Sequence, residues 1–420
     1  METIVIIDLG TNYSQEVARM VRSCRVYSEI VPGNTSAASL KGKNLVGIIV
    51  VGTSPGEDPQ ALGLDPEISK LGVPLLALSA SKKHDAKTTM KHVEDFLAKE
   101  CRTGQDWTMQ LFVDTMVETI RRQVGEKRLV CGLSGGIDSA VAAMLVHKAV
   151  GRQLTCIFVD HGFMRQNEAE EVIETYSEYD LNLIAVDARD RFLAKIKGVA
   201  DPEQKRKLIG AEFIRVFEEE ARKLGDVDFL VQGTVYPDVI ESGLGKHGVI
   251  KSHHNVGGLP ENLKFELVEP LRQLFKDEVR QAAAILGLPE TIIQRHPFPG
   301  PGLAIRIIGE VTPAKLEILR KADHIFIDEL RKSGWYPQVW QAFAVLTDIR
   351  TVGVKDAERT YDYTVALRAV HSTDGMTARW VRLPYELLEL ASARILAEVG
   401  GVNRVVYDLS AKPPATIEWE

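Results

Sequence analysis

One short segment limits what this chain can fold into, the run SGGIDS at residues 134–139. It stands between an apolar stretch typical of a buried strand (128–133) and another typical of a helix (140–150). A glycine-rich turn between a strand and a helix lets the backbone approach an anion, and its N–H groups and the helix dipole attract negative charge. We therefore expect the phosphates of a nucleotide to bind at Ser134, Gly135, Gly136, Ile137, Asp138 and Ser139.

The side chains of this loop can also bind phosphate and Mg2+. Asp138 supplies a carboxylate that can hold Mg2+ against phosphates, and Ser134 and Ser139 supply hydroxyl donors. No Gly-Lys-Ser/Thr sequence follows the glycines, so the segment is not a Walker loop. The alternative is an ordinary strand-to-helix turn with serine caps. We favour the nucleotide site because the strand, the loop and the helix occur together, as phosphate binding requires.

The rest of the chain alternates strands and helices, as a parallel sheet with helical crossovers does. Residues 1–105 contain four apolar runs and two amphipathic stretches, and VPLLALS (73–79) predicts a buried strand. Residues 106–300 continue the alternation around the SGGIDS loop and predict a doubly wound sheet. The run RHPFPGPGLA (295–304) is rich in proline and glycine and marks a boundary.

A different pattern follows this boundary. LAIRIIGEV (303–311) predicts a strand, residues 313–334 predict a helix, and two later strands are joined in the manner of a hairpin around 355–362. This mixture is typical of a small α+β domain. The predicted fold is therefore α/β with three domains: a small α/β domain (1–105), a doubly wound parallel-sheet domain (106–300) and an α+β domain (301–420).

Composition narrows the class of protein. A net charge of −7 over 420 residues argues against a broad nucleic-acid surface, because phosphate neutralisation needs clustered Lys and Arg. The four cysteines form no CxxC pair and no metal-ligand spacing, which is typical of reduced thiols in the cytoplasm. The N-terminal apolar run is too short to span a membrane and lacks the basic region of a signal peptide. We expect a cytoplasmic protein that binds neither nucleic acid nor membranes.

The loop resembles the pyrophosphate loop of the N-type ATP pyrophosphatases, which cleave ATP between its α and β phosphates and adenylylate a second substrate. Longer strings point to one family within that group. FVDHGFMRQNE (158–168), QGTVYPDVIES (232–242), KSHHNVGGLP (251–260) and KPPATIEWE (412–420) all resemble the GMP synthetases. The resemblance extends nearly without gaps over residues 106–420.

This resemblance implies a ligase that aminates XMP to GMP with ATP and Mg2+. The O2 atom of XMP would attack the α-phosphorus of ATP and release pyrophosphate, and ammonia would then displace AMP at C2. Positioning and charge neutralisation would supply most of the catalysis, so that no side chain need act as a covalent nucleophile.

For the ATP site, the resemblance implicates Phe158, Val159 and Gly233 beside the loop. An adenine could stack at the strand end formed by Phe158 and Val159, although both could equally be ordinary sheet core. Asp238 and Glu241, three residues apart after a strand, could share a helix face and hold Mg2+ with Asp138. Their alternative is the solvated start of a helix.

Two groups of basic residues complete the expected ATP site. Lys251, followed by His253 and His254 in a glycine-rich stretch, is interpreted as part of a lid that brings positive charge to the pyrophosphate, with a surface loop as the alternative. Lys251 and Asp138 are the predicted catalytic residues. The basic cluster 205–207 would ordinarily be a solvated helix face, but in the family such a cluster neighbours the nucleotide site.

The second substrate, a purine monophosphate, needs cations for its phosphate and polar groups for its base. The resemblance places at the XMP site Arg165, Gln341, Lys412, Ile417 and Glu418. Lys412 is the expected partner of the phosphate. Ile417 and Trp419 favour a docked rather than a frayed C-terminal segment.

Residues 1–105 resemble the start of a class I glutamine amidotransferase domain without its chemistry. Ser79 stands where the family's nucleophilic cysteine follows a strand, and the glycines that should flank it are absent. Gly52-Thr53 replaces the glycines of the oxyanion loop, and no His-Pro-Glu sequence occurs in this part of the chain. A serine without a base is a poor nucleophile. We interpret the domain as a truncated, degenerate remnant and Ser79 as a relic.

The leading hypothesis is a homodimeric GMP synthetase that uses free ammonia or ammonia from a separate glutaminase. The dimer is expected from residues 303–420, because a small domain with a strand and a hairpin struggles to cover its sheet surface. One alternative keeps glutamine use within the chain through an unfamiliar site. Another is a nucleotide-binding regulator that has lost catalysis.

Overall fold

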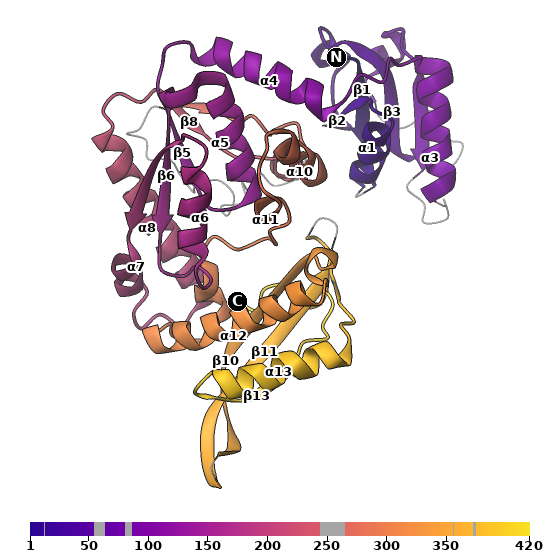
Figure 1. The fold of residues 1–420 in the computed structure, drawn as a ribbon. Coiled ribbons are helices and arrows are strands. Elements are labelled where there is room, and N and C mark those ends of the chain that lie inside the picture. Colours follow the sequence, from indigo (N-terminus) through magenta and orange to yellow (C-terminus); the bar gives the residue numbers. More distant parts are fainter. Residues whose placement is uncertain (12, 54–63, 80–85, 244–264, 356, 373–374) are drawn as a thin grey trace. The chain divides into compact units, whose positions relative to one another are not determined.

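The computed structural model describes residues 1–11, 13–53, 64–79, 86–243, 265–355, 357–372 and 375–420, and of Thr53 and 241–243 the backbone alone. The chain divides into two compact units, Met1–Met116 with Tyr236–Ile250, and Val117–Val235 with Lys251–Glu420 (Figure 1). Within the described ranges, no helix is long and apolar enough to cross a membrane.

The first unit is built on a parallel sheet of four strands in the order β2-β1-β3-β4. Strand β1 pairs with β2 on one edge and β3 on the other, and Thr3 and the apolar residues Ile4–Ile7 are buried, as in a parallel sheet that is covered on both faces. The elements of this unit are β1 (Thr3–Asp8), α1 (Ser14–Ser23), β2 (Tyr27–Pro32), α2 (Ala37–Leu40), β3 (Leu45–Thr53), a 3-10 helix (Pro66–Lys70), β4 (Leu75–Ser79), α3 (Ala86–Asp95), a π-helix (Phe96–Cys101), the first part of α4 (Met109–Val124) and α9 (Tyr236–Gly243).

Strand β4, which ends at Ser79, differs from its prediction. It is an edge strand that pairs only with β3 among the described residues, and not a buried one. Leu75 and Leu76 are half-buried and Ala77 is exposed. An apolar run predicts burial, but a strand with a single sheet neighbour leaves part of that run uncovered.

A cluster of aromatic residues holds α9 and the segment before α4 in the first unit. The Arg22 guanidinium lies 4.9 Å from the ring centre of Tyr27, 5.2 Å from that of Trp107 and 5.1 Å from that of Tyr236. The hydroxyl of Tyr236 also accepts a hydrogen bond from the N–H of Ile30. Cation–π and hydrogen-bond contacts of this kind give a small sheet domain stabilisation that its short strands cannot supply alone.

The second unit contains the predicted doubly wound sheet, with five parallel strands in the order β7-β6-β5-β8-β9. Helices cover both faces, α5 and α6 on one and α8 on the other (Figure 1). Its elements are β5 (Leu129–Leu133), α5 (Ile137–Val150), a 3-10 turn (Gly151–Gln153), β6 (Leu154–Asp160), α6 (Glu168–Ser177), β7 (Asn182–Asp187), α7 (Arg189–Lys195), α8 (Pro202–Lys223), β8 (Phe229–Val231), β9 (Glu266–Val268), α10 (Lys276–Ile285) and α11 (Glu290–Ile293).

The strand order places the loop 134–139 where parallel α/β sheets bind ligands. From β5 the chain continues to β6 on one side, and later returns to β8 on the other side. In open parallel sheets, ligands bind beyond the carboxyl end of the strand at which the strand order reverses. The loop follows that strand end directly.

The C-terminal part of this unit is the predicted α+β domain. A long antiparallel hairpin forms its sheet, and α12 and α13 pack side by side against it (Figure 1). Its elements are a 3-10 helix (Gly302–Arg306), α12 (Pro313–Lys332), a 3-10 helix (Tyr336–Gln338), β10 (Gln341–Lys355), β11 (Glu358–His371), β12 (Arg379–Trp380), α13 (Tyr385–Glu398) and β13 (Val402–Tyr407).

The strand predicted over 303–311 is wrong. Residues Gly302–Arg306 form a 3-10 helix, and of the segment only Ile307 makes an isolated bridge, to Leu346. Residues 303–307 are buried on all sides, Arg306 included, and the N–H of Leu303 donates to the carbonyl of Phe163. A short segment buried all round shows no period that separates a strand from a helix.

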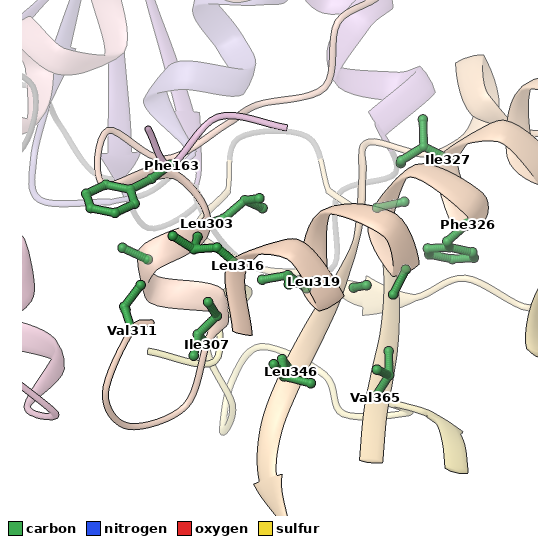
Figure 2. Close-up of a cluster of buried hydrophobic side chains, with 14 of the residues drawn as sticks. Phe163, Leu303, Ile307, Val311, Leu316, Leu319, Phe326, Ile327, Leu346 and Val365 are labelled. Atoms are coloured by element: carbon green, nitrogen blue, oxygen red, sulfur yellow. The ribbon is translucent and has the colours of Figure 1, made fainter. Parts of the chain in front are cut away.

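One hydrophobic core continues across the boundary predicted near residue 300. Phe163, from the loop after β6, lies in the same cluster as Leu303, Leu316 on α12 and Leu346 on β10 (Figure 2). Val365 of β11 belongs to it as well. The two parts of this unit therefore share their interior, and residues that are distant in sequence are held in fixed positions around it.

Candidate active site

Residues 134–139, called the phosphate loop below because phosphates are expected there, have the geometry that the sequence predicts. Gly135 has a φ of +75°, a left-handed conformation that favours glycine. A Cβ atom there would lie 3.0 Å from Nη1 of Arg295 and 3.1 Å from Cγ2 of Val172. Gly136 is the extended N-cap of α5, so the helix begins at Ile137 and its first N–H groups face the loop.

The two serines of the loop hold it closed. The hydroxyls of Ser134 and Ser139 lie 3.1 Å apart, and the Ser139 hydroxyl donates to the carbonyl of Gly136 at 3.0 Å. The N–H of Ser134 in turn donates to the Ser139 hydroxyl at 3.3 Å. These bonds fix the turn before a ligand arrives, which lowers the ordering cost of binding.

Asp138 lies in the first turn of α5, and its two carboxylate oxygens have different surroundings. Oδ2 accepts a hydrogen bond from Nζ of Lys276, the first residue of α10. Oδ1 is buried and has no hydrogen-bond partner among the described residues. Gly233 makes room for this arrangement, because a Cβ atom there would lie 3.0 Å from the Asp138 carbonyl carbon. A buried carboxylate oxygen without a partner suits a hard cation such as Mg2+.

Lys276 was missed by the sequence interpretation. It lies at a helix start, where a lysine is unfavourable to the helix dipole, and this is the one signal that would have singled it out. Its position beside Asp138 puts a cation at the end of the loop where phosphates are expected.

The other predicted Mg2+ ligands lie on one helix. Asp238 is in the first turn of α9, and the backbone of Glu241 is in the same helix, so the predicted helix is confirmed. Where the structure describes side chains, no group of three His, Cys, Asp or Glu residues comes together as a metal site would. The shared Mg2+ site with Asp138 stays a prediction. Lys251, His253 and His254 lie outside the described residues.

The side chains of Phe158 and Val159 belong to the sheet core. They are 1% and 2% exposed on β6, and Val159 packs in the main hydrophobic cluster. An adenine could therefore meet only the main chain at this strand end, and contact between these residues and the nucleotide stays a prediction.

Arg295 joins the phosphate loop to the segment that precedes the C-terminal domain. Its Nη1 donates to the carbonyl of Gly135, and its Nη2 lies 2.9 Å from a carboxylate oxygen of Glu168. Glu168 also accepts from the N–H of Arg165 at 2.8 Å. The sequence marked 295–304 as a boundary, and gave no indication that its first residue supports the loop.

Three of the predicted XMP residues come together around the segment 296–298. Arg165 donates to the carbonyl of Ala342 at 2.9 Å and lies 3.3 Å from a carboxylate oxygen of Asp323. Gln341 donates to the Pro297 carbonyl at 3.0 Å and to Oε1 of Glu418 at 2.9 Å. Arg165, Gln341 and Glu418 thus line one region, although the sequence separates them widely.

The segment 412–420 is docked, as predicted. Ile417 is buried, and its carbonyl accepts a hydrogen bond from Nε of Arg368 at 2.6 Å. The indole N–H of Trp419 donates to Asp408 at 2.9 Å, although the ring is partly exposed. Lys412 lies at its start, where Nζ donates to the carbonyl of Gly375 at 2.7 Å.

Within the basic cluster 205–207, the alternative of a solvated helix face is excluded for Lys205, and the expected place of the cluster beside the nucleotide site stays a prediction. This residue is fully buried, and its ammonium pairs with the carboxylate of Glu420. Burial lowers the pKa of Lys205, and the charge of Glu420 offsets part of that shift. The helical pattern alone predicts exposure for a lysine, so only the fold identifies this one as buried.

His296 is a neutral histidine next to this region. Its ring stacks on Tyr336 with centroids 3.8 Å apart, Nδ1 accepts from the N–H of Ala342 at 3.2 Å, and Nε2 lies 2.9 Å from the Tyr336 carbonyl. These contacts require the Nε2–H tautomer. Burial lowers the pKa of His296 to about 4.

Comparison with known proteins agrees with this architecture. Residues 108–212 match the family model described as NAD synthase, and residues 328–419 match the GMP synthase C terminal domain. Among curated relatives, the glutamine-hydrolyzing GMP synthase of Carboxydothermus hydrogenoformans is 50% identical, with 99% of each chain covered. The protein of the same name from Caldicellulosiruptor saccharolyticus is 47% identical, over 100% of this chain and 99% of that one. Among solved structures, an NMN synthetase from Francisella tularensis covers 47% of this chain and 78% of that one, at 17% identity and a TM-score of 0.37, which is too low to bear on function.

The parallel sheet with its phosphate loop, followed by an antiparallel domain, defines an α/β protein of the ATP pyrophosphatase type with a C-terminal α+β domain. Because the similarity to the curated relatives extends over whole chains, the protein belongs to the family of glutamine-hydrolyzing GMP synthases. The second alignment has 508 positions against 420 residues here, so at least 88 positions have no residue of this chain.

Proposed function

We propose that this chain converts XMP to GMP with ATP, releasing AMP and pyrophosphate. The observation that carries the proposal is the phosphate loop with Asp138 and Lys276 at its end, in the same compact unit as Arg165, Gln341 and Glu418. Membership of the GMP synthase family supports the choice of substrate.

The proposed reaction has two steps, and in each step one bond forms and one bond breaks. The O2 atom of XMP forms a bond to the α-phosphorus of ATP, and the bond from that phosphorus to the bridging oxygen breaks, so pyrophosphate leaves. Ammonia then adds at C2, and the C2–O2 bond breaks to release AMP. Adenylylation is needed because a carbonyl oxygen is a poor leaving group. The protein's part is to align the two nucleotides and neutralise charge.

Within the ATP site, Lys276 is the described cation that would receive the leaving pyrophosphate, and Lys251 is the further cation expected from the sequence. Mg2+ supplies neutralisation of phosphate charge, and Oδ1 of Asp138 fits it as a ligand. Asp238 and Glu241 are the proposed further ligands. At the other substrate, Lys412 would hold the phosphate of XMP, while Ile417 and Glu418 would contact its base.

We further propose that ammonia comes from solution or from a separate glutaminase. The N-terminal unit has Ser79 at the strand end where the resemblance implies a cysteine, and β4 there is a half-exposed edge strand. The 88 or more alignment positions without a residue of this chain are consistent with a shortened domain.

A homodimer in the cytoplasm is the proposed form of the protein. The long hairpin β10–β11 carries Val352, Val354 and Tyr361 with more than half of each side chain exposed, and Tyr385 on α13 is 86% exposed. Contact with a second copy would cover such apolar surface.

The test is GMP formation from XMP, ATP and either ammonium or glutamine. The reaction is measured by absorbance and chromatography. We expect turnover with ammonium and none with glutamine. Turnover with pure glutamine would contradict the proposed loss of the glutaminase site. Tight nucleotide binding without turnover on either nitrogen source would instead indicate a regulator.

A further inference from the structure

Cationic side chains from distant elements of the same unit bind the end of the docked segment 412–420. Nζ of Lys205, on α8, donates to the carbonyls of Ala304 at 3.3 Å and Ile307 at 2.8 Å, and pairs with the carboxylate of Glu420. Lys205 has no exposed surface, and the side chain of Glu420 is 7% exposed. All three donor directions of this ammonium are therefore used.

Glu420 is bound on both carboxylate oxygens. Oε2 accepts from Lys205, and Oε1 accepts from the N–H of Gly309 at 3.1 Å. In addition, the main-chain oxygen of Glu420 accepts from Nη2 of Arg206. Such a set of contacts fixes both the side chain and the backbone of this residue.

Two residues earlier, Glu418 is held by a second buried cation. Arg306 donates from Nε to Oε2 at 3.0 Å and from Nη2 to Oε1 at 2.8 Å, which is a bidentate pair. The guanidinium also lies 4.0 Å from the ring centre of Phe343, and it is fully buried. Gln341 shares Oε1 of Glu418.

Because of these contacts, the fold is stable only when the segment 417–420 is docked. A buried ammonium or guanidinium without its counter-charge is strongly unfavourable, because water no longer solvates it. Lys205 therefore needs Glu420 in place, and Glu420 in place restricts where Ile417 and Glu418 can lie. The anchor is separate from the groups proposed to touch XMP.

We propose that Lys205 and Glu420 are positioning residues for the XMP site, acting through the segment 417–420. This inference rests on the proposed function, because that function gives Ile417 and Glu418 their ligand. It predicts that the anchor sets the affinity for XMP and leaves the affinity for ATP unchanged.

The test is the variant Glu420→Gln, which keeps the size of the side chain and removes its charge. We expect the KM and the calorimetric Kd for XMP to rise about tenfold, the effect of losing one charge-assisted hydrogen bond. The KM for ATP should stay within twofold, and so should kcat at saturating XMP. A matched control is Glu317→Gln on α12, which removes the exposed partner of Lys321 at 2.8 Å and should change neither constant.

A second variant separates positioning from stability. In Lys205→Met/Glu420→Gln neither charge of this pair remains, so the midpoint of thermal unfolding should be higher than in Glu420→Gln alone. The Kd for XMP should stay raised, because the segment has lost its anchor. Recovery of XMP affinity along with stability would overturn the proposal.

The remaining outcomes are distinct. If wild-type protein makes GMP but Glu420→Gln binds XMP within twofold of it, the anchor has no positioning role and the proposed function stands. If Glu420→Gln raises the KM for ATP as much as that for XMP, the pair is structural only. If wild-type protein neither binds XMP nor makes GMP, both the proposed function and this inference are overturned.

Discussion

Asp138 and Lys276 form an ion pair at the end of the phosphate loop, although 138 positions of sequence separate them. One oxygen of the loop carboxylate is thus paired with a cation, and the other is buried without a partner among the described residues. The pair presents positive charge on one side and a ligand for a cation on the other. Triphosphate bound with Mg2+ carries the complementary charges.

Asp138→Ala should abolish adenylylation and leave the fold intact. Lys276→Met should lower kcat/KM about 10²–10³-fold, the usual effect of removing one preorganised charge. Neither variant should lower the unfolding midpoint much, because both side chains are partly exposed and such pairs contribute at most about 1 kcal/mol. Pyrophosphate release with XMP and ATP measures the rate. A near-normal rate in Asp138→Ala would refute its assigned role.

The products should be AMP and pyrophosphate in equal amounts with GMP, because the loop is not a Walker loop. Removal of Mg2+ by a chelator should stop the reaction, and added Mg2+ should restore it. Chromatography of the nucleotides distinguishes AMP from ADP. Stoichiometric ADP and orthophosphate would exclude the proposed chemistry.

Nitrogen should come from ammonium and not from glutamine. The proposed loss of both nucleophile and base would remove the covalent route, and oxyanion donors alone supply about 10²–10³-fold. We expect Ser79→Ala to change neither turnover with ammonium nor stability by much, and Ser79→Cys alone to leave glutamine unused. Glutaminase assays on the three proteins check this. Glutamine hydrolysis that disappears in Ser79→Ala would identify Ser79 as a working nucleophile.

Light scattering at micromolar concentration should give the mass of a homodimer. Charged residues on the exposed hairpin, as in Val352→Glu with Val354→Glu, should shift the protein toward monomer, because both positions would place charge in an apolar contact. The same substitution at the partly exposed Leu111 of α4 serves as a control outside this domain. A monomeric wild type would contradict the prediction.

Stability should fall on acidification partly through His296. Its pKa is about 4 in the folded protein and 6.5 as the ordinary value, so between these values the unfolded chain binds a proton and the folded chain does not. The free energy of unfolding therefore decreases as pH falls, by about 1.5 kcal/mol between pH 6.5 and 5 from this residue. His296→Gln should show a loss smaller by that amount in urea titrations. An unchanged pH dependence would mean that His296 is charged in the fold.

What could be predicted from the sequence was local. The loop 134–139 and the strand before it are specified by glycines and an apolar run within a dozen residues, and the structure agrees with both. The contacts Lys276–Asp138, Arg295–Gly135 and Lys205–Glu420 join residues far apart in the chain. A single sequence has no pattern that pairs such residues, because a charged side chain looks the same whether its partner is water or a buried carboxylate. The strand expected over 303–311 failed for a related reason, since complete burial removes the period that distinguishes strands.

The core shared across residue 300 makes the second unit a single cooperative block. Phe163 and Phe192 from the sheet part touch the same cluster as Leu303 and Ile307, so a fragment ending at 300 would lose one side of its own interior. Domains with separate cores can be separated without loss of either interior, whereas separation of these two parts would expose the core that they share. The two halves, which are proposed to hold the two substrates, should therefore unfold in one transition, and a destabilising substitution in either half should lower the stability of both.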